Sequence, residues 1–190
     1  AVFSAASINV SAVLAGRQPP AVSGYVVGLI LGLVIFFQMR VLDEVKDREV
    51  DAKYRPERPI PRGLVSLRLI VGLALGAGLL AVAATWLWSP VLMWLLALAW
   101  LWLAAMSFEF GARDWLRERL AFYMVSHMAI MPLTDLLLTG IEWVPHARPA
   151  SGLWVFLALS FVNGCVLELG RKIWAPESER EGVESYSAIW

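Results

Sequence analysis

Residues 21–51 read AVSGYVVGLILGLVIFFQMRVLDEVKDREVD, an uncharged apolar stretch that runs directly into a dense cluster of charges. The part from 21 to 39 has the length and composition of a helix that crosses a bilayer core, for which roughly 20 residues suffice. Asp43, Asp47 and Asp51 then recur at a spacing of four. Each such step turns a helical side chain by only about 40°. The stretch therefore predicts a membrane helix that continues into a stripe of three carboxylates.

The rest of the chain repeats the apolar pattern. It has 190 residues, of which 59% are hydrophobic, with a mean hydropathy of +0.65, whereas soluble domains are roughly 45–50% apolar. Nearly uncharged blocks follow one another along the chain: 1–16, 21–39, 69–88, 91–108, 120–141 and 152–167. We therefore expect an all-α fold, a polytopic transmembrane bundle with about six membrane helices.

The charges are distributed unevenly between the two sides of this predicted bundle. Of 16 lysines and arginines, only Arg17 and Arg148 fall in loops on one side. The positive-inside rule places the loops that hold the remaining lysines and arginines in the cytoplasm. We expect a single transmembrane domain over 1–190, with cytoplasmic loops 40–68 and 109–119 and a cytoplasmic tail 169–190. This predicts a multi-pass protein of a bacterial inner membrane with its acidic loops inside.

Both ends of the sequence resemble cuts. The chain begins at Ala1 within an apolar block, and it stops at Trp190 where apolar residues resume. We expect it to be a piece of a longer protein.

The aspartate stripe calls for a positive partner, because three carboxylates one turn apart repel one another. A divalent cation suits this position, and the oxygens of a phosphate group can complete its coordination. The alternative is a solvated helix end in which the aspartates pair with Lys46 and Arg48. The basic, proline-rich loop that follows, Arg55 to Gly63, favours the ligand-binding interpretation.

A second acidic cluster follows the last apolar block. It contains Glu168, Glu177, Glu179 and Glu181, together with Arg171 and Lys172. Two acidic clusters on one face could hold Mg²⁺ ions with a diphosphate between them, because Mg²⁺ prefers a few carboxylates plus phosphate oxygens. Salt bridging to the neighbouring cations is the competing interpretation for these glutamates.

At this point the sequence resembles the UbiA family of membrane prenyltransferases. Asp43-x-x-x-Asp47-x-x-x-Asp51 and the run Arg58-Pro59-Ile60-Pro61-x-Gly63 are similar to that family's first motif. Glu168 to Glu181 stands where its second acidic motif follows helix six, and Gly182-Val183-Glu184-Ser185 is similar to the end of that motif. Leu42 replaces an Asn of the first motif, and glutamates replace the aspartates of the second.

The resemblance implies a fold of nine membrane helices, of which this chain would supply six and lack the last three. It implies that Asp43, Asp47 and Asp51 act in catalysis and bind Mg²⁺, together with Glu168 and Glu179. It also implies substrate contacts from the following residues: Lys46, Lys53, Arg58, Arg62, Glu168, Glu177 and Glu179.

The main hypothesis is thus an enzyme that transfers a prenyl group from an allylic prenyl diphosphate to a lipid-soluble, aromatic acceptor, with Mg²⁺ as cofactor. Its partners would be these two substrates and membrane lipids, with no nucleic acid. One alternative is a non-catalytic UbiA-like subunit that binds partner proteins in a membrane complex. Another is a transporter, since intramembrane carboxylates often mark ion paths.

Asp135 and His127 have two interpretations each, and a pair of glycines has one. Asp135 either faces the protein interior or lies near the outer surface, and the short distance to Glu142 favours the surface. His127 either packs in the bundle or lines a cavity. Gly72 and Gly76 have the spacing of a close helix–helix contact.

Overall fold

The computed structural model describes residues 1–179 and 185–189, and these residues form helices and loops without strands. The long elements are α1 (Val2–Leu14), α2 (Val22–Lys46), α4 (Leu67–Trp88), α5 (Leu92–Ser107), α7 (Leu120–Met128), α8 (Ile130–Trp143) and α9 (Leu153–Lys172). The short elements are α3 (Arg48–Tyr54), η1 (Glu109–Gly111), α6 (Arg113–Arg117), η2 (Val144–His146), η3 (Pro176–Ser178) and α10 (Tyr186–Ile189). The predicted all-α membrane bundle is confirmed.

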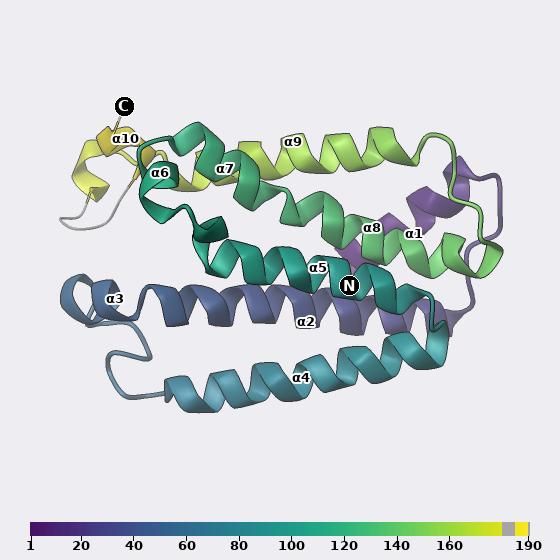
Figure 1. Cartoon of the computed structure of the whole chain (residues 1–190), viewed down its shortest axis with the longest axis horizontal. Helices are drawn as coiled ribbons and strands as arrows, with labels where there is room; N and C mark the ends of the chain where they lie inside the picture. The colour runs from purple at the N-terminus through teal and green to yellow at the C-terminus, as the bar shows by residue number, and fades with distance from the viewer. Residues whose placement is uncertain (180–184, 190) are drawn as a thin grey trace.

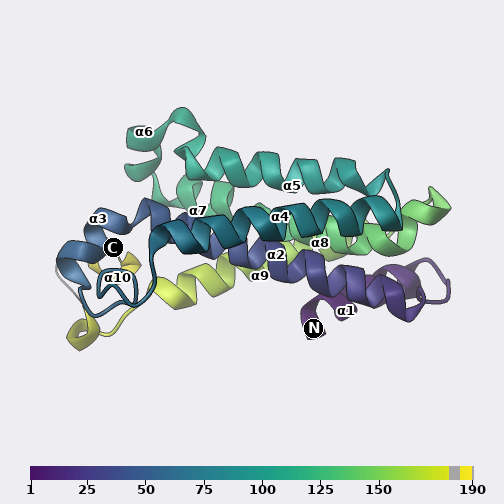
Figure 2. The ribbon, with the colours of Figure 1, turned by 90° about the horizontal axis from the view of Figure 1, so that it is seen from below.

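The long helices run side by side along one axis (Figures 1 and 2). Four stretches are long and apolar enough to cross a membrane: Val22–Lys46, Leu67–Trp88, Leu120–His146 and Leu153–Lys172. The apolar helices α1 and α5 are shorter. The elements α3, α6 and α10 gather at one end of the bundle, which we call the charged end (Figure 1).

The core lies where α8 packs against α1, α2, α5 and α9. Ile8, Leu31, Leu96 and Leu137 are fully buried there. On α4, by contrast, many large apolar side chains are exposed, such as Leu79 and Leu87. Such a surface suits contact with lipid tails, because burial in lipid removes apolar area from water as a protein core does.

The apolar block 120–141 forms two helices, α7 and α8, where the sequence analysis expected one. The break falls at Ala129, which links Met128 and Ile130. Pro132 accounts for it, because proline has no N–H to donate to the carbonyl four residues earlier and its ring crowds that carbonyl. The break displaces α7 from the line of α8 (Figure 1), and α7 packs against α9.

Local signals in the sequence decide other helix ends. Ser66 caps α4, as its hydroxyl accepts a hydrogen bond of 3.2 Å from the Leu69 amide, which satisfies one of the free N–H groups of the first turn. The expected contact at Gly72 and Gly76 is wrong. A methyl group added at either glycine would meet no atom of the described residues within 4 Å. Gly28 of α2 makes the close approach instead, against Ile8 and Ile141.

Candidate functional site at the charged end

The three aspartates lie on consecutive turns at the end of α2 and along α3. The Asp47 amide donates to the Asp43 carbonyl at 2.8 Å, and the Asp51 amide donates to the Asp47 carbonyl at 2.8 Å. These are helical i to i−4 bonds. They keep the three residues in register across the junction between α2 and α3, so the backbone forms the stripe that the spacing predicts.

The side chains of the stripe do not share one environment. Asp51 is buried, with 1% of its surface exposed. Its carboxylate contacts the Arg58 guanidinium and lies 3.5 Å from Nη1 of Arg55. Burial opposes the charge of Arg58, but the hydrogen bond and the charge of Asp51 outweigh this and raise the pKa of the guanidinium. Asp51 therefore fixes the loop after α3 through two arginines.

Asp43 and Asp47 are more open. Asp43 is exposed and Asp47 is half-buried. Neither carboxylate forms an ion pair with the described residues. Two carboxylates one turn apart fit a Mg²⁺ ion that takes its other ligands from phosphate and water. Within residues 1–179 and 185–189, no three His, Cys, Asp or Glu side chains come together as a group that could hold a metal. The expected metal ligands Asp43, Asp47, Asp51, Glu168 and Glu179 therefore do not form one such group in this structure.

An open hollow of about 700 Å³ lies between the loop after α3 and the segment after α9. Arg55 and Arg58 line it from one side, and Arg171 and Trp174 from the other. Asp43 is close enough to Arg171 to interact electrostatically with it, and Asp47 is similarly close to Arg58. The hollow thus offers three guanidinium groups, the donors best suited to phosphate oxygens, beside two carboxylates.

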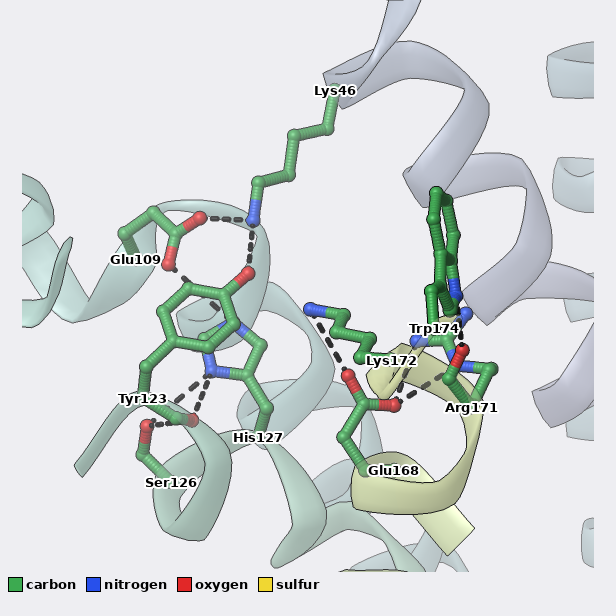
Figure 3. Close-up of polar contacts among 9 residues, drawn as sticks. All are labelled: Lys46, Glu109, Tyr123, Ser126, His127, Glu168, Arg171, Lys172 and Trp174. Carbon is green, nitrogen blue, oxygen red and sulfur yellow. Dashed lines mark hydrogen bonds and ion pairs between the residues drawn. The ribbon is translucent and has the colours of Figure 1, made fainter. Parts of the chain in front are cut away.

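Two glutamates of the second acidic cluster, Glu168 and Glu179, have partners within the chain. Glu168 accepts from Arg171 at 2.7 Å and lies 3.1 Å from Lys172 (Figure 3). Hydrogen bonds from the hydroxyls of Ser185 and Ser187 to Glu179, at 2.6 and 2.5 Å, lower the pKa of this carboxyl.

The remaining members of the second cluster are Glu177 and Glu181. Glu177 is exposed in η3, and Glu181 and Gly182 to Glu184 lie outside the described residues. Glu168 thus makes the salt bridges of the competing interpretation, whereas the described partners of Glu179 are serine hydroxyls.

The other basic residues expected at the site lie apart from the hollow. Arg62 is exposed, and the ammonium of Lys53 lies 4.7 Å from the ring centroid of its neighbour Tyr54. Lys46 pairs with Glu109 (Figure 3) and does not line the hollow. Of the predicted phosphate-binding cations, Arg58 alone lines the hollow among the described residues.

Around Lys46 the structure brings together residues from α2, η1 and α7 (Figure 3). Lys46 donates to the Tyr123 hydroxyl at 2.8 Å. The Tyr123 ring stacks on His127 with centroids 4.0 Å apart, and Nε2 of His127 lies 3.4 Å from Oε2 of Glu109. His127 is thus part of a polar cluster at the charged end.

The sequence analysis missed Glu109, Tyr123, Arg55 and Trp174. Glu109 carried one usable signal, as it is an acid directly after the apolar block 91–108. The pairing of Glu109 with Lys46 joins residues far apart in the chain, and no local pattern encodes it.

The expected surface position of Asp135 is wrong. Asp135 is 2% exposed, and its two oxygens accept from Ser7 of α1 at 2.6 Å and from Ser160 of α9 at 2.5 Å. Glu142 is buried as well, although it lies closer to the end of α8, and it accepts from Ser11 and Arg17. Both carboxylates join helices far from the charged end.

The fold and the site thus define a helical membrane protein with paired carboxylates and an arginine-lined hollow at one end. The model of the UbiA prenyltransferase family matches residues 2–162, and the chain belongs to this family of membrane prenyltransferases. The match includes the aspartate stripe and ends before Glu168. No curated protein and no solved structure matches the chain.

Proposed function

We propose that the protein transfers a prenyl group from an allylic prenyl diphosphate to a lipid-soluble aromatic acceptor, with Asp43 and Asp47 as ligands of Mg²⁺. The observation that carries the proposal is the position of these two carboxylates beside a hollow lined by Arg55, Arg58 and Arg171. Arginine binds phosphate oxygens in pairs, and a Mg²⁺ ion needs only one or two carboxylates when phosphates supply the rest.

In this proposal the arginines bind and orient the diphosphate at the mouth of the bundle. Their fixed positive charge stabilises the negative charge that grows on the leaving group, since they are held in place before the reaction begins. Asp51 positions Arg58 and Arg55 and does not ligate the metal. The bound Mg²⁺ would neutralise further charge on the departing diphosphate. The isoprenoid chain would lie along the apolar helices, away from water.

The test is the release of diphosphate from geranyl, farnesyl and geranylgeranyl diphosphate by the purified protein in lipid nanodiscs, with phenolic acceptors added. We expect release that depends on Mg²⁺ and falls by a factor of about 10² or more in the double variant Asp43→Asn, Asp47→Asn, the range for loss of groups that hold transition-state charge. Glu49→Gln is the matched control, because Glu49 is an exposed acid on α3. Unchanged release in the double variant would reject the proposal.

A non-catalytic role in a membrane complex is the second candidate, and the neutralised state of Glu168 favours it. In this case the second acidic cluster would serve structure alone. The protein would then purify with partner proteins and would bind no prenyl diphosphate in the presence of Mg²⁺. Saturable binding of farnesyl diphosphate, measured by calorimetry, would argue against this role.

A further inference from the structure

Glu168 is buried at the end of α9, and both of its carboxylate oxygens contact cations. Nε and Nη2 of Arg171 donate to Oε2 at 3.1 and 2.7 Å, and Nζ of Lys172 lies 3.1 Å from Oε1 (Figure 3). The same ammonium lies 5.5 and 5.3 Å from the ring centroids of Tyr123 and Tyr186, and such cation–π contacts favour its position. Only 7% of Glu168 is exposed. A metal ion at this carboxylate would therefore meet two positive charges at close range, and their repulsion opposes its binding.

The opposite wall of the hollow is built in the same way. Asp51 is 1% exposed and contacts the guanidiniums of Arg55 and Arg58. Each wall thus combines one buried carboxylate with two cations, and one negative charge against two positive charges leaves a net charge of +1 on each side. The positive charge of the two walls therefore comes from the chain itself.

Arg171 has donors left for a ligand in the hollow. An arginine has five N–H groups, and two of those of Arg171 are directed at Glu168. Its side chain is 68% exposed and lines the hollow. It also lies close enough to Asp43 of α2 for an electrostatic interaction. A guanidinium in this position can bind phosphate oxygens, while a Mg²⁺ ion on Asp43 and Asp47 binds other oxygens of the same diphosphate.

Glu179, the other acid expected to bind metal on this side, holds the segment that follows α9. Its two oxygens accept from the hydroxyls of Ser185 and Ser187 at 2.6 and 2.5 Å. Oγ of Ser187 accepts in turn from the amide of Trp174 at 2.8 Å, and Trp174 lines the hollow. The other acid among the residues that line the hollow is Glu57, which is exposed. The described acids on the α9 side of the hollow therefore do not gather around a position for a metal ion.

Resting on the diphosphate binding proposed above, we propose that the site binds a single divalent cation with each diphosphate, and that the guanidinium of Arg171 takes the place of a second cation. Asp43, Asp47 and phosphate oxygens hold the metal ion. Glu168 binds no metal, because Arg171 and Lys172 engage both of its oxygens. The guanidinium is in place before the ligand arrives, so it needs no reorganisation when negative charge develops on the diphosphate. The resemblance to the UbiA family implied metal ligands in both acidic clusters, and this proposal keeps only those of the first.

Equilibrium dialysis counts the metal ions directly. The chain, in nanodiscs of neutral phosphatidylcholine, is dialysed against Mn²⁺ and geranyl thiolodiphosphate, a donor analogue whose carbon–sulfur bond resists cleavage. Mn²⁺ prefers the same oxygen ligands as Mg²⁺. We expect one Mn²⁺ and one diphosphate per chain, with the electron paramagnetic resonance spectrum of an isolated ion. Two Mn²⁺ ions per diphosphate, with the spectrum of a spin-coupled pair, overturn the proposal.

Single variants test the roles of the two residues on the α9 side. In Glu168→Gln we expect the dissociation constant of Mn²⁺ to stay within about threefold of the native value, whereas even residues that only support metal ligands cost about 10–100-fold when replaced. In Arg171→Met we expect the dissociation constant of the thiolodiphosphate to rise about 10–100-fold, the range for hydrogen bonds to charged groups, with the metal count still at one. Arg62→Met is the matched control, because Arg62 is exposed and does not line the hollow. A loss of Mn²⁺ affinity of more than about tenfold in Glu168→Gln, or native binding of the thiolodiphosphate by Arg171→Met, overturns the proposal.

The metal count and the turnover can fail separately. One Mn²⁺ per diphosphate in a protein that transfers no prenyl group would contradict the prenyl transfer and leave the single-metal site standing. Two Mn²⁺ per diphosphate in a protein that transfers the prenyl group would do the reverse. A chain that binds no thiolodiphosphate would contradict both.

Discussion

Replacement of Asp51 by Asn tests whether a carboxylate of the stripe stabilises the fold or binds the metal. Asp51 is 1% exposed and contacts Arg58 and Arg55. The variant would leave both guanidiniums without a carboxylate. Loss of one partner from a buried ion pair costs about 3–5 kcal/mol. The side chains of Arg58 and Arg55 are 26% and 20% exposed and are partly solvated, so we expect a smaller loss of about 2–3 kcal/mol.

For a chain of this size each kcal/mol shifts Tm by about 2–4 °C. We therefore expect Asp51→Asn to lower Tm by about 4–12 °C, as measured by circular dichroism of the purified protein in detergent. The comparison is the double variant Asp43→Asn, Asp47→Asn. This variant removes a like-charge pair one turn apart, which is worth only about 0.2–0.5 kcal/mol. Its Tm should equal or slightly exceed that of the native protein.

The same samples also separate metal binding from stability. Mg²⁺ with inorganic diphosphate should raise the Tm of the native protein and leave that of the double variant unchanged, because a ligand stabilises only the state that binds it. A native Tm for Asp51→Asn together with a large loss for the double variant would refute the assignment of Asp51 as the structural member of the stripe.

Two further predictions concern packing and ionisation. Gly28→Ala should lower the free energy of unfolding by about 1–2 kcal/mol, because its new Cβ would lie 2.7 Å from Cδ1 of the fully buried Ile8. Gly76→Ala has open space around it and should be neutral or stabilising by up to about 1 kcal/mol. Equal Tm values for these two variants would contradict this prediction. Burial, with the charge of Glu168, raises the pKa of Tyr186 to about 12, so the stability that depends on its neutral phenol is present at neutral pH and is lost as the pH rises through about 12. The absorbance of tyrosinate should therefore show a late component that Tyr186→Phe removes. A titration unchanged by that substitution would show the assignment to be wrong.

The sequence predicted the features that depend on neighbours along the chain. The apolar blocks predicted a helical membrane bundle, since roughly 20 apolar residues cross a bilayer whatever they pack against; four of the stretches are long enough to span, and α1 and α5 are shorter than expected. The spacing of Asp43, Asp47 and Asp51 fixed their turn-by-turn order, because helical periodicity is local. The cap at Ser66 is also a local feature, because its hydroxyl accepts a hydrogen bond from an amide three residues later. The helix break caused by Pro132 could also be predicted from the sequence, but the continuous apolar pattern of 120–141 favoured a single helix.

Only the tertiary structure decided which charges meet. It separated Asp51 from Asp43 and Asp47, because the loop after α3 returns Arg55 and Arg58 to one of the three carboxylates. It paired Glu109 with Lys46 and His127, and it buried Asp135 against two serines from other helices. The free energy of a charge depends on the groups within a few ångströms and on its access to water, and both are set by the packing of helices that are remote in sequence. The sequence by itself therefore determined a helical membrane protein with an acidic stripe, while the fold determined which acids of the stripe remain available to a ligand.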